Sequence, residues 1–246
     1  MKAILKIILP IIIACISSLL IIDYKYERHK NEHSENIEET IEYINVWTTT
    51  NVDIKSEPDT DSEIIGNYSW NAKLIVTYID DNWAKVKDIE HYIDRSFLCE
   101  SPVSYIDYDV PNNDGIKSYM DYRTITYTPS NQYKLQKVAY TKDGLRMVND
   151  RYCIALGSYY TTKIGQYVDI ELENGNVIHG ILADCKADKD TDSTNRIHAT
   201  DGSVVEFVVD IESLNYIAKR MGDISYINGW NSKVINIRVY DKIEEY

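Results

Sequence analysis

The sequence predicts a mainly β protein that follows a single N-terminal transmembrane helix. Three observations lead to this prediction. Short runs of β-branched and aromatic residues recur along the chain and are bounded by Gly, Asn or Asp, as strands and turns are. Tyrosine is abundant and phenylalanine rare, 21 against 2, and tyrosine suits the half-buried face of a sheet. The first 22 residues are almost entirely apolar.

Length and charge narrow the function classes. A chain of 246 residues can hold one large domain or two small ones with real cores. The formal net charge of -13, without any basic stripe, argues against binding to a phosphate backbone, so no nucleic-acid partner is expected. Three cysteines lie outside the apolar segment (Cys99, Cys153 and Cys185), and so sparse a set is not a disulfide framework. We expect no cofactor and no metal ion.

Residues 1–22 are predicted to be a membrane anchor. Lys2 and Lys6 precede an apolar run from Ile7 to Ile22, slightly shorter than the roughly 20 residues of a spanning helix. No small-residue cleavage site precedes Asp23. The residues Ile12 to Cys15 resemble a lipoprotein cleavage box, but the chain stays hydrophobic after them, so an uncleaved anchor is favoured over a lipoprotein or a cleaved signal. Residues 23–45 are acidic and show isoleucines at helical spacing, which predicts a short helical stalk.

Residues 46–100 are predicted to form a small β module. The expected strands recur at the spacing of a small barrel or sandwich and are Ile64–Tyr68, Leu74–Tyr78, Trp83–Val86 and Tyr92–Leu98.

The same module resembles the bacterial SH3-like (SH3b) family. Val52–Pro58 stands for its opening motif, Trp83–Val86 for its Trp-x-Lys-Val motif, and His91–Ile93 with Phe97 and Leu98 for its closing motif. Members bind cell-wall peptides, so the resemblance implies that Trp83 and Tyr92 line a groove for a peptidoglycan stem peptide. The alternative is that Trp83 belongs to the core of the module.

Residues 101–117 contain two prolines and an Asn-Asn-Asp-Gly run and are predicted to be a linker. A second domain is expected over residues 118–246. Its predicted elements are strands at Tyr122–Tyr127 and Lys134–Tyr140, a hairpin turn at Lys142–Gly144, strands at Tyr152–Leu156, Tyr167–Leu172, Val177–Ala183 and Val204–Val209, a helix at Glu212–Met221 ending at Gly222, and a last strand at Val234–Tyr240.

Two of these strands deliver an aspartate at or just past their apolar end, Asp184 and Asp210. A carboxylate at the rim of a rigid sheet is suited to acid–base catalysis, because its surroundings can shift its pKa. The simpler interpretation is two solvated aspartates at strand ends.

The stretch from Arg151 to Asp210 resembles the double-psi β-barrel of the 3D family, cell-wall proteins named for three aspartates. Ile154–Gly157 matches its first block, Lys163–Leu172 the second, Leu182–Asp184 the third, and Val209 with Asp210 the last. The resemblance implies a six-stranded double-psi-type barrel. Some relatives are lytic transglycosylases, which implies Asp184 as the catalytic acid and Asp210 as its neighbour. Gly157 stands where the first aspartate belongs.

Two other kinds of chemistry have weaker signals. Cys185 or Cys153 with His179 or His198 supplies the residue types of a cysteine nucleophile, without an orienting motif. The run Asp188–Asp192 opens like a calcium-binding loop, but the required glycine and bidentate glutamate are absent, so an acidic loop is favoured.

Two functional hypotheses follow. In the first, a membrane-anchored cell-envelope protein with extracellular domains engages the glycan strand and stem peptide of peptidoglycan, and its barrel cleaves the glycan as a lytic transglycosylase. In the alternative, it is a non-catalytic cell-wall binding or scaffold protein with a degenerate barrel. A regulator that faces the cytoplasm is a third interpretation.

Overall fold

The computed structural model describes residues 41–246, which are mainly β. They form two compact units with one sheet each. Unit 1 ends at Ser101, and unit 2 spans Pro102–Tyr246. The predicted anchor at residues 1–22 and the stalk up to residue 40 lie outside the described part of the chain. Within residues 41–246, no helix is both long and apolar enough to cross a membrane.

Unit 1 contains a seven-stranded sheet in which all strand pairs are antiparallel, with the order β3-β2-β6-β5-β4-β1-β7. Alternate strand residues face a small buried core of valine, leucine, isoleucine and alanine side chains. The strands are β1 (Ile44–Thr48), β2 (Val52–Lys55), β3 (Ile64–Tyr68), β4 (Lys73–Tyr78), β5 (Trp83–Val86), β6 (Tyr92–Asp94) and β7 (Leu98–Cys99).

Two predictions for unit 1 were wrong in detail. Ile44, which was assigned to the helical stalk, pairs with Val76 in β1, because its side chain packs against the core of the unit. The expected strand Tyr92–Leu98 is interrupted by a 3-10 turn at Arg95–Phe97. The carboxylate of Asp94 causes this break, since it accepts hydrogen bonds from the backbone and the hydroxyl of Ser96 at 2.9 and 2.7 Å.

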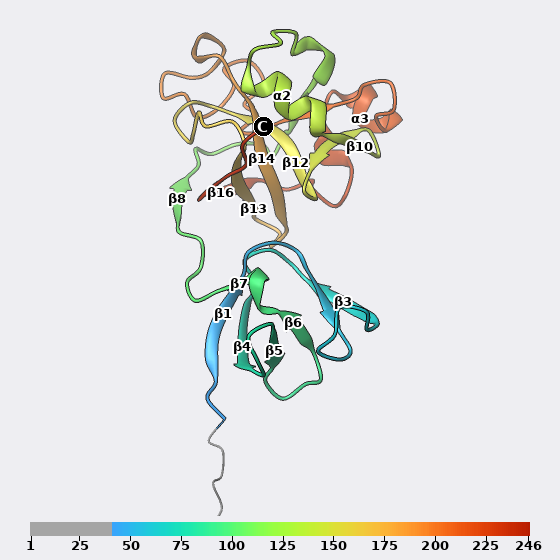
Figure 1. Cartoon of the computed structure of the whole chain (residues 1–246). Helices are drawn as coiled ribbons and strands as arrows, with labels where there is room; N and C mark the ends of the chain where they lie inside the picture. Colours follow the sequence, from blue (N-terminus) through green and yellow to red (C-terminus); the bar gives the residue numbers. More distant parts are fainter. Residues whose placement is uncertain (1–40) are drawn as a thin grey trace, which may run out of the picture. The chain divides into compact units, whose positions relative to one another are not determined.

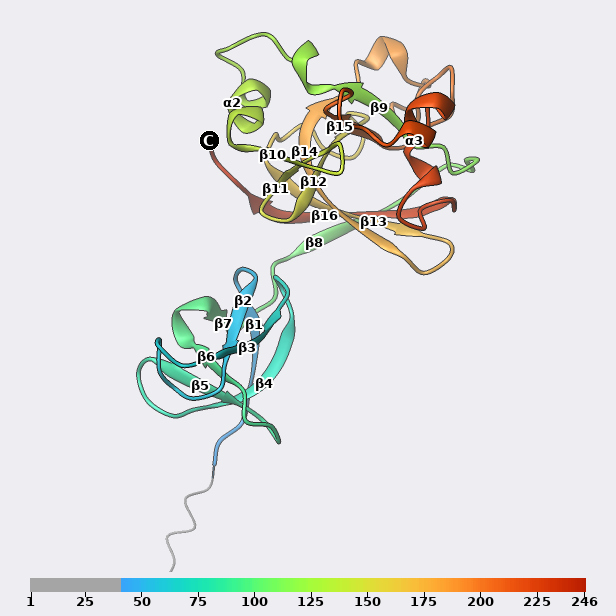
Figure 2. The same ribbon diagram turned by 90° about the vertical axis from the view of Figure 1, so that its right-hand side faces the viewer.

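Unit 2 contains a nine-stranded sheet rather than the six strands expected. Its main path is β10-β11-β15-β12-β14-β13-β16-β8, and β9 pairs with β15. Figure 1 shows β8 near β16, and Figure 2 shows β9 beside β15. The strands are β8 (Tyr105–Asp109), β9 (Ser118–Asp121), β10 (Tyr140–Lys142), β11 (Leu145–Val148), β12 (Arg151–Leu156), β13 (Gln166–Leu172), β14 (Val177–Cys185), β15 (Glu206–Val209) and β16 (Val234–Ile243).

Two strand pairs in this sheet are parallel, β12 with β14 and β15 with β9, while the other pairs are antiparallel. The core lies between these strands and the segment after them. Phe207 stacks on Trp230 with 5.2 Å between ring centroids, and Tyr152 meets the same indole edge-on at 5.0 Å. Strand β8 comes from residues that were predicted to be linker, because the prolines on either side of it hide its alternation.

The strands predicted at Tyr122–Tyr127 and Lys134–Tyr140 were wrong. The first stretch begins as a 3-10 turn, Tyr122–Thr124, and the second lies mostly in helix α2, Asn131–Val138. The hydroxyl of Ser130 accepts a hydrogen bond from the backbone N–H of Tyr133 at 3.1 Å and caps the helix. Leu135 is fully buried, so one face of the helix packs on the sheet.

Other local predictions were confirmed. Asp143 and Gly144 adopt positive φ angles of 51° and 82°, as a tight hairpin turn between β10 and β11 requires. Helix α3 spans Tyr216–Met221 and ends at Gly222 in the left-handed conformation, as expected. The helix is shorter than predicted, because Asn215 caps it at Ile217.

Candidate active site around Asp184

Asp184 lies near the end of β14, where a register irregularity re-aims the strand. Leu182 pairs with Ile154 on β12, but the next pair is Asp184 with Ala155, so Ala183 is skipped. Bulges of this kind change which way a side chain points. Leu182 and Ala183 are fully buried and Asp184 is half-buried, so the carboxyl group emerges where the core ends.

A cavity of about 270 Å³ opens beside this carboxyl group. Its lining is rich in hydroxyl and amide side chains and consists of Met120, Thr124, Ile125, Thr126, Tyr127, Ser130, Gln132 and Asp184. Most of these residues come from the segment between β9 and α2, the stretch that had been assigned to strands. Polar groups that converge in a partly apolar cavity are typical of small-molecule sites. We call this space the Asp184 cavity.

Burial raises the pKa of Asp184 above its ordinary value. Two hydrogen bonds act in the opposite direction, since they favour the charged form. The Cys185 backbone N–H donates to the carboxylate at 2.9 Å, and the Gln132 side chain also hydrogen-bonds to it. The raised pKa keeps more of the group protonated, which is the state a general acid needs.

The structure places a second carboxyl group, Glu206, in the same row of the sheet. Ala155 on β12 pairs with Asp184 on one side and with Glu206 on the other. The two acids are therefore two strand spacings apart, roughly 10 Å between backbones. Paired residues point to the same face of a sheet, although Ala155 between them is buried and Glu206 is not among the residues that line the Asp184 cavity.

The pKa of Glu206 is also raised. Burial is the main cause, and the negative charges of Asp201 and Asp184 add to it, while Lys186 and His198 lower the pKa. Sequence reasoning missed Glu206 because it treated Val204–Val209 as an apolar strand ending on an aspartate. The signal was a charged residue inside that apolar run.

Asp210 is not among the residues that line the Asp184 cavity. It follows β15, four residues beyond Glu206, and is part of an ionic cluster around Arg123. The Arg123 guanidinium lies 3.7 Å from the Asp210 carboxylate and binds Asp121 at 2.7 Å. The Asp210 carboxylate also accepts from the backbone of Glu212 at 3.2 Å and from the Ser213 hydroxyl at 3.1 Å.

In unit 1, Trp83 and Tyr92 share one face of the β5–β6 pair. Trp83 pairs with Asp94, and Tyr92 pairs with Lys85, two residues along the strand from Trp83. Trp83 is only 8% exposed, so little of its indole is accessible to a ligand. Tyr92 is half-buried, and its hydroxyl donates to Glu90 at 2.6 Å.

The alternative cysteine chemistry lacks support from the environment of the thiols. Burial raises the pKa of Cys153 to about 12 and that of Cys185 to about 11, so both stay protonated at neutral pH. Both are free, and they lie opposite Ile181 and Leu156 rather than each other. The histidines bind aspartates instead: His179 contacts Asp169 at 2.9 Å.

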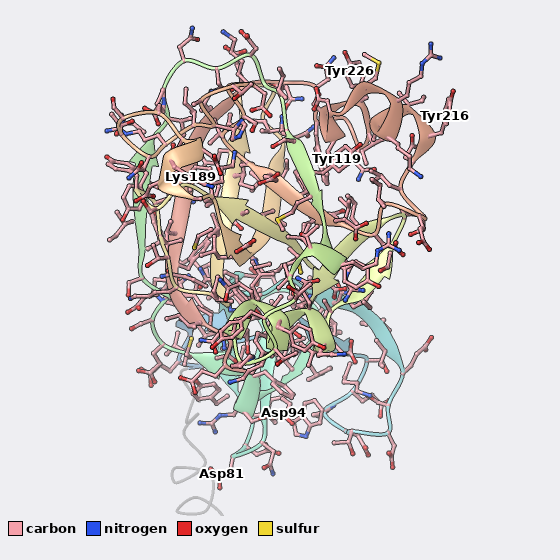
Figure 3. The ribbon with its side chains drawn as sticks, turned by 90° about the horizontal axis from the view of Figure 1, so that it is seen from above. Asp81, Asp94, Tyr119, Lys189, Tyr216 and Tyr226 are labelled. Carbon is pink, nitrogen blue, oxygen red and sulfur yellow. The ribbon has the colours of Figure 1, made fainter. Side chains whose placement is uncertain are left out.

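The acidic segment between β14 and β15, residues 186–205, is called here the acidic insertion. Its aspartates form hydrogen bonds that fix the conformation of its own loops. The Asp192 carboxylate accepts from the backbone N–H groups of Arg196 and Ile197 at 2.7 and 3.1 Å. The Asp188 carboxylate accepts from the Ser158 hydroxyl at 2.6 Å. Over residues 41–246, no group of His, Cys, Asp or Glu side chains is arranged to hold a metal ion. Lys189 in Figure 3 marks the position of this insertion.

The same insertion explains the glycine at position 157. A Cβ atom on Gly157 would lie 2.0 Å from the backbone carbonyl oxygen of Asn195, well inside any real contact distance. The insertion therefore fills the space that a side chain at residue 157 would need, and only glycine fits there.

In comparisons with known proteins, no family model matches this chain, and no curated protein matches it by sequence. A solved structure with partial similarity is NlpC2 from Trichomonas vaginalis, at 16% identity and a TM-score of 0.22, covering 69% of this chain and 68% of that one. A TM-score this low does not indicate a shared fold.

Proposed function

We propose that this chain is a cell-envelope protein that binds peptidoglycan and that Asp184 is the acid of a lytic transglycosylase site. One observation carries the proposal: a half-buried carboxyl group with a raised pKa lies in a cavity lined by hydroxyl and amide side chains. Such side chains match the hydroxyl and N-acetyl groups of an amino-sugar chain. The resemblance of residues 151–210 to the 3D family supplies the reaction class.

The proposed reaction needs only one proton donor. Asp184 protonates the bridging oxygen, and the bond between that oxygen and C1 of the sugar breaks. The C6 hydroxyl oxygen of the same sugar then bonds to C1 and returns its proton to the Asp184 carboxylate. No water is consumed, and the product carries a 1,6-anhydro end.

In this proposal Glu206 takes the neighbouring role that the sequence assigned to Asp210. Its place in the row Asp184–Ala155–Glu206 supports this assignment. The charge of Asp184 raises the pKa of Glu206, because like charges repel, whereas the pKa of Asp184 itself is raised by burial. Asp210 is instead engaged with Arg123.

The finer fold and the location of the protein belong to the same proposal. Unit 2 is a double-psi-type barrel, and the two parallel strand pairs in its sheet support this. Unit 1 is an SH3b module whose Tyr92, beside Trp83, contacts the stem peptide. Residues 1–22 anchor the chain in the cell membrane with both units outside. A C-terminal reporter that proved inaccessible from outside the cell would instead support a regulator facing the cytoplasm.

A non-catalytic cell-wall scaffold is the second candidate function. The position of Asn195 favours it, because the carbonyl oxygen of this residue occupies the space where the family's first aspartate would project from residue 157. A barrel with one of its acids replaced by glycine can bind glycan without cleaving it.

Incubation of the full-length chain with purified sacculi separates the two candidates. The enzyme releases anhydro-muropeptides, which mass spectrometry detects, and the product disappears in Asp184→Asn while binding to sacculi remains. Asp210→Asn is the matched control and should retain the product, since Asp210 lies outside the Asp184 cavity. Binding without any product from the unmodified protein would leave the scaffold function, and loss of product only in the Asp210 variant would contradict the assignment of the acid.

A further inference from the structure

A second cavity of about 500 Å³ lies in unit 2 between the β8–β16 edge and the loop after β12. We call it the tyrosine cavity. Its lining residues are Ser104, Tyr105, Ile106, Tyr108, Ser158, Tyr160, Thr161, Thr162, Lys163, Gln166, Val239, Tyr240 and Asp241. No sequence motif predicts this cavity, because its walls come from three segments that are far apart along the chain.

The rings in this cavity form two edge-to-face pairs. Tyr105 meets Tyr240 at 5.7 Å between centroids, and Tyr108 meets Tyr160 at 5.9 Å. Such pairs hold the rings in fixed orientations. Tyr105 is 49% exposed, and although the Arg238 guanidinium lies over its ring at 4.1 Å from the centroid, a ligand can reach the rest of the ring. Fixed aromatic rings among serine, threonine and glutamine side chains suit a ligand with both apolar faces and many hydroxyl or amide groups, which describes a sugar.

Tyr160 adds an independent indication of a ligand. The residue is 3% exposed, and its hydroxyl has no hydrogen-bond partner among the residues that the structure describes. Buried polar groups are nearly always paired, and each exception needs an explanation. The hydroxyl oxygen is out of solvent contact, so a ligand in the cavity reaches it only if the ring shifts, and pairing would then remove the cost of the buried, unpaired hydroxyl.

A third cavity of about 590 Å³ shares lining residues with both the tyrosine cavity and the Asp184 cavity. Thr162 and Lys163 line both the tyrosine cavity and the third cavity, and Gln132 lines both the third cavity and the Asp184 cavity. The two larger volumes fall within the range of roughly 300–1,000 Å³ that is usual for ligand sites. The three spaces are therefore neighbours, as the binding of several units of one chain molecule requires.

The charges of the side chains that line the three cavities disfavour the binding of a polyanion. Lys163 is the one basic side chain among the lining residues, whereas Asp184, Asp241, Glu244 and Glu245 are acidic. A phosphate polymer would meet a net negative surface, and a neutral amino-sugar chain would not.

We propose that the tyrosine cavity is a second sugar-binding subsite, which holds the same glycan strand at a distance from Asp184. This inference rests on the proposed function and extends it, because it makes the affinity for glycan depend on chain length. Sugar units that reach the tyrosine cavity add binding energy that shorter oligomers do not gain.

Calorimetric titration of the full-length chain with oligomers of N-acetylglucosamine, from the disaccharide to the hexasaccharide, tests the inference. The affinity of the unmodified protein should rise with length. Tyr105→Ala should weaken hexasaccharide binding about tenfold, equivalent to about 1.4 kcal/mol, and Tyr105→Phe should retain the affinity. Tyr216→Ala is the matched control, because Tyr216 is an exposed tyrosine at the start of α3 (Figure 3) and is not among the residues that line the three cavities. Thr162→Trp, which obstructs the space between the tyrosine cavity and the third cavity, should abolish the increase in affinity with oligomer length.

The outcomes separate this inference from the proposed activity. Equal hexasaccharide affinities in the Tyr105→Ala and Tyr216→Ala variants would overturn the subsite, even if sacculi are cleaved. An affinity that does not rise with length, or no binding at all, would also overturn it. Length-dependent binding that Tyr105→Ala removes would support the subsite, even if no anhydro product is formed and the lytic activity is rejected.

Discussion

Substitution of Gly157 by alanine tests how tightly the acidic insertion packs on the sheet of unit 2. The new Cβ atom would lie 2.0 Å from the Asn195 carbonyl oxygen and 2.8 Å from its carbonyl carbon. Real Cβ contacts do not fall below 3.0 Å, so the backbones must separate by about 1 Å. Both atoms belong to the backbone, and a rotamer change cannot relieve the clash. Overpacking of this kind typically costs about 1–3 kcal/mol.

Urea unfolding followed by circular dichroism measures this cost as a lower transition midpoint at an unchanged slope. Gly66→Ala is the control, since a Cβ on Gly66 meets only the end of the Ile54 side chain at 3.4 Å, an ordinary contact. We expect that control to stay within about 0.5 kcal/mol of the unmodified protein. If the Gly157→Ala variant is equally stable, then the insertion does not pack where the structure places it.

The close contact between Gly157 and Asn195 also has a consequence for catalysis. Gly157→Asp, which introduces the aspartate that the 3D pattern has at this position, should destabilise unit 2 more than Gly157→Ala does, because a larger side chain meets the same carbonyl oxygen. It should not increase glycan cleavage. An increase in anhydro products in this variant would refute the argument that the insertion occupies the position.

Three further predictions concern buried polar groups. Tyr160→Phe removes an unpaired hydroxyl, so the melting temperature should stay level or rise, and a loss of more than about 1 kcal/mol would show that the hydroxyl has a partner. Asp184→Asn should be more stable than the unmodified protein at neutral pH and equally stable below pH 3.8. Burial raises the pKa of Asp184 in the folded state, so the unmodified protein loses stability as pH rises from 3.8 through that pKa. Unfolding of both proteins at several pH values measures the difference. Lys186 has its pKa lowered to about 8 by burial, so its own contribution to stability should grow as pH rises from about 8 toward 10.5, and the unmodified protein should gain stability relative to Lys186→Met over that range. Lys117, whose pKa is also about 8, contributes in the same direction, whereas the raised pKa values of Cys153 and Cys185 act in the opposite direction above pH 9.0.

The strands of unit 2 were predictable where local and tertiary preferences agree. The stretches around Val168, Ile181 and Val239 alternate or run apolar between turn residues, and each forms a strand close to its expected bounds. Gly144 and Gly222 fixed a turn and a helix end, because few other residues adopt positive φ at low cost.

The errors arose where local signals compete. The stretch Lys134–Tyr140 contains β-formers, yet the cap at Ser130 and the burial of Leu135 favour a helix. Prediction of the candidate site from the sequence was limited in the same way. Asp184 could be proposed from its own strand, but Glu206 becomes its neighbour only through the pairing of both with Ala155, and strand register is not readable from a single sequence.

Strand β8 is the first element of unit 2, and it connects the mechanics of the chain to ligand binding. Tyr105 and Ile106 form one wall of the tyrosine cavity, and their strand is held to the unit by its ladder with β16. A pulling force applied through residue 102 acts first on this ladder. If β8 separates from β16, the tyrosine cavity loses the wall that Tyr105 and Ile106 form. A bound ligand therefore stabilises the pairing of β8 with β16 against a pulling force, and by the same coupling a pulling force lowers the affinity for the ligand.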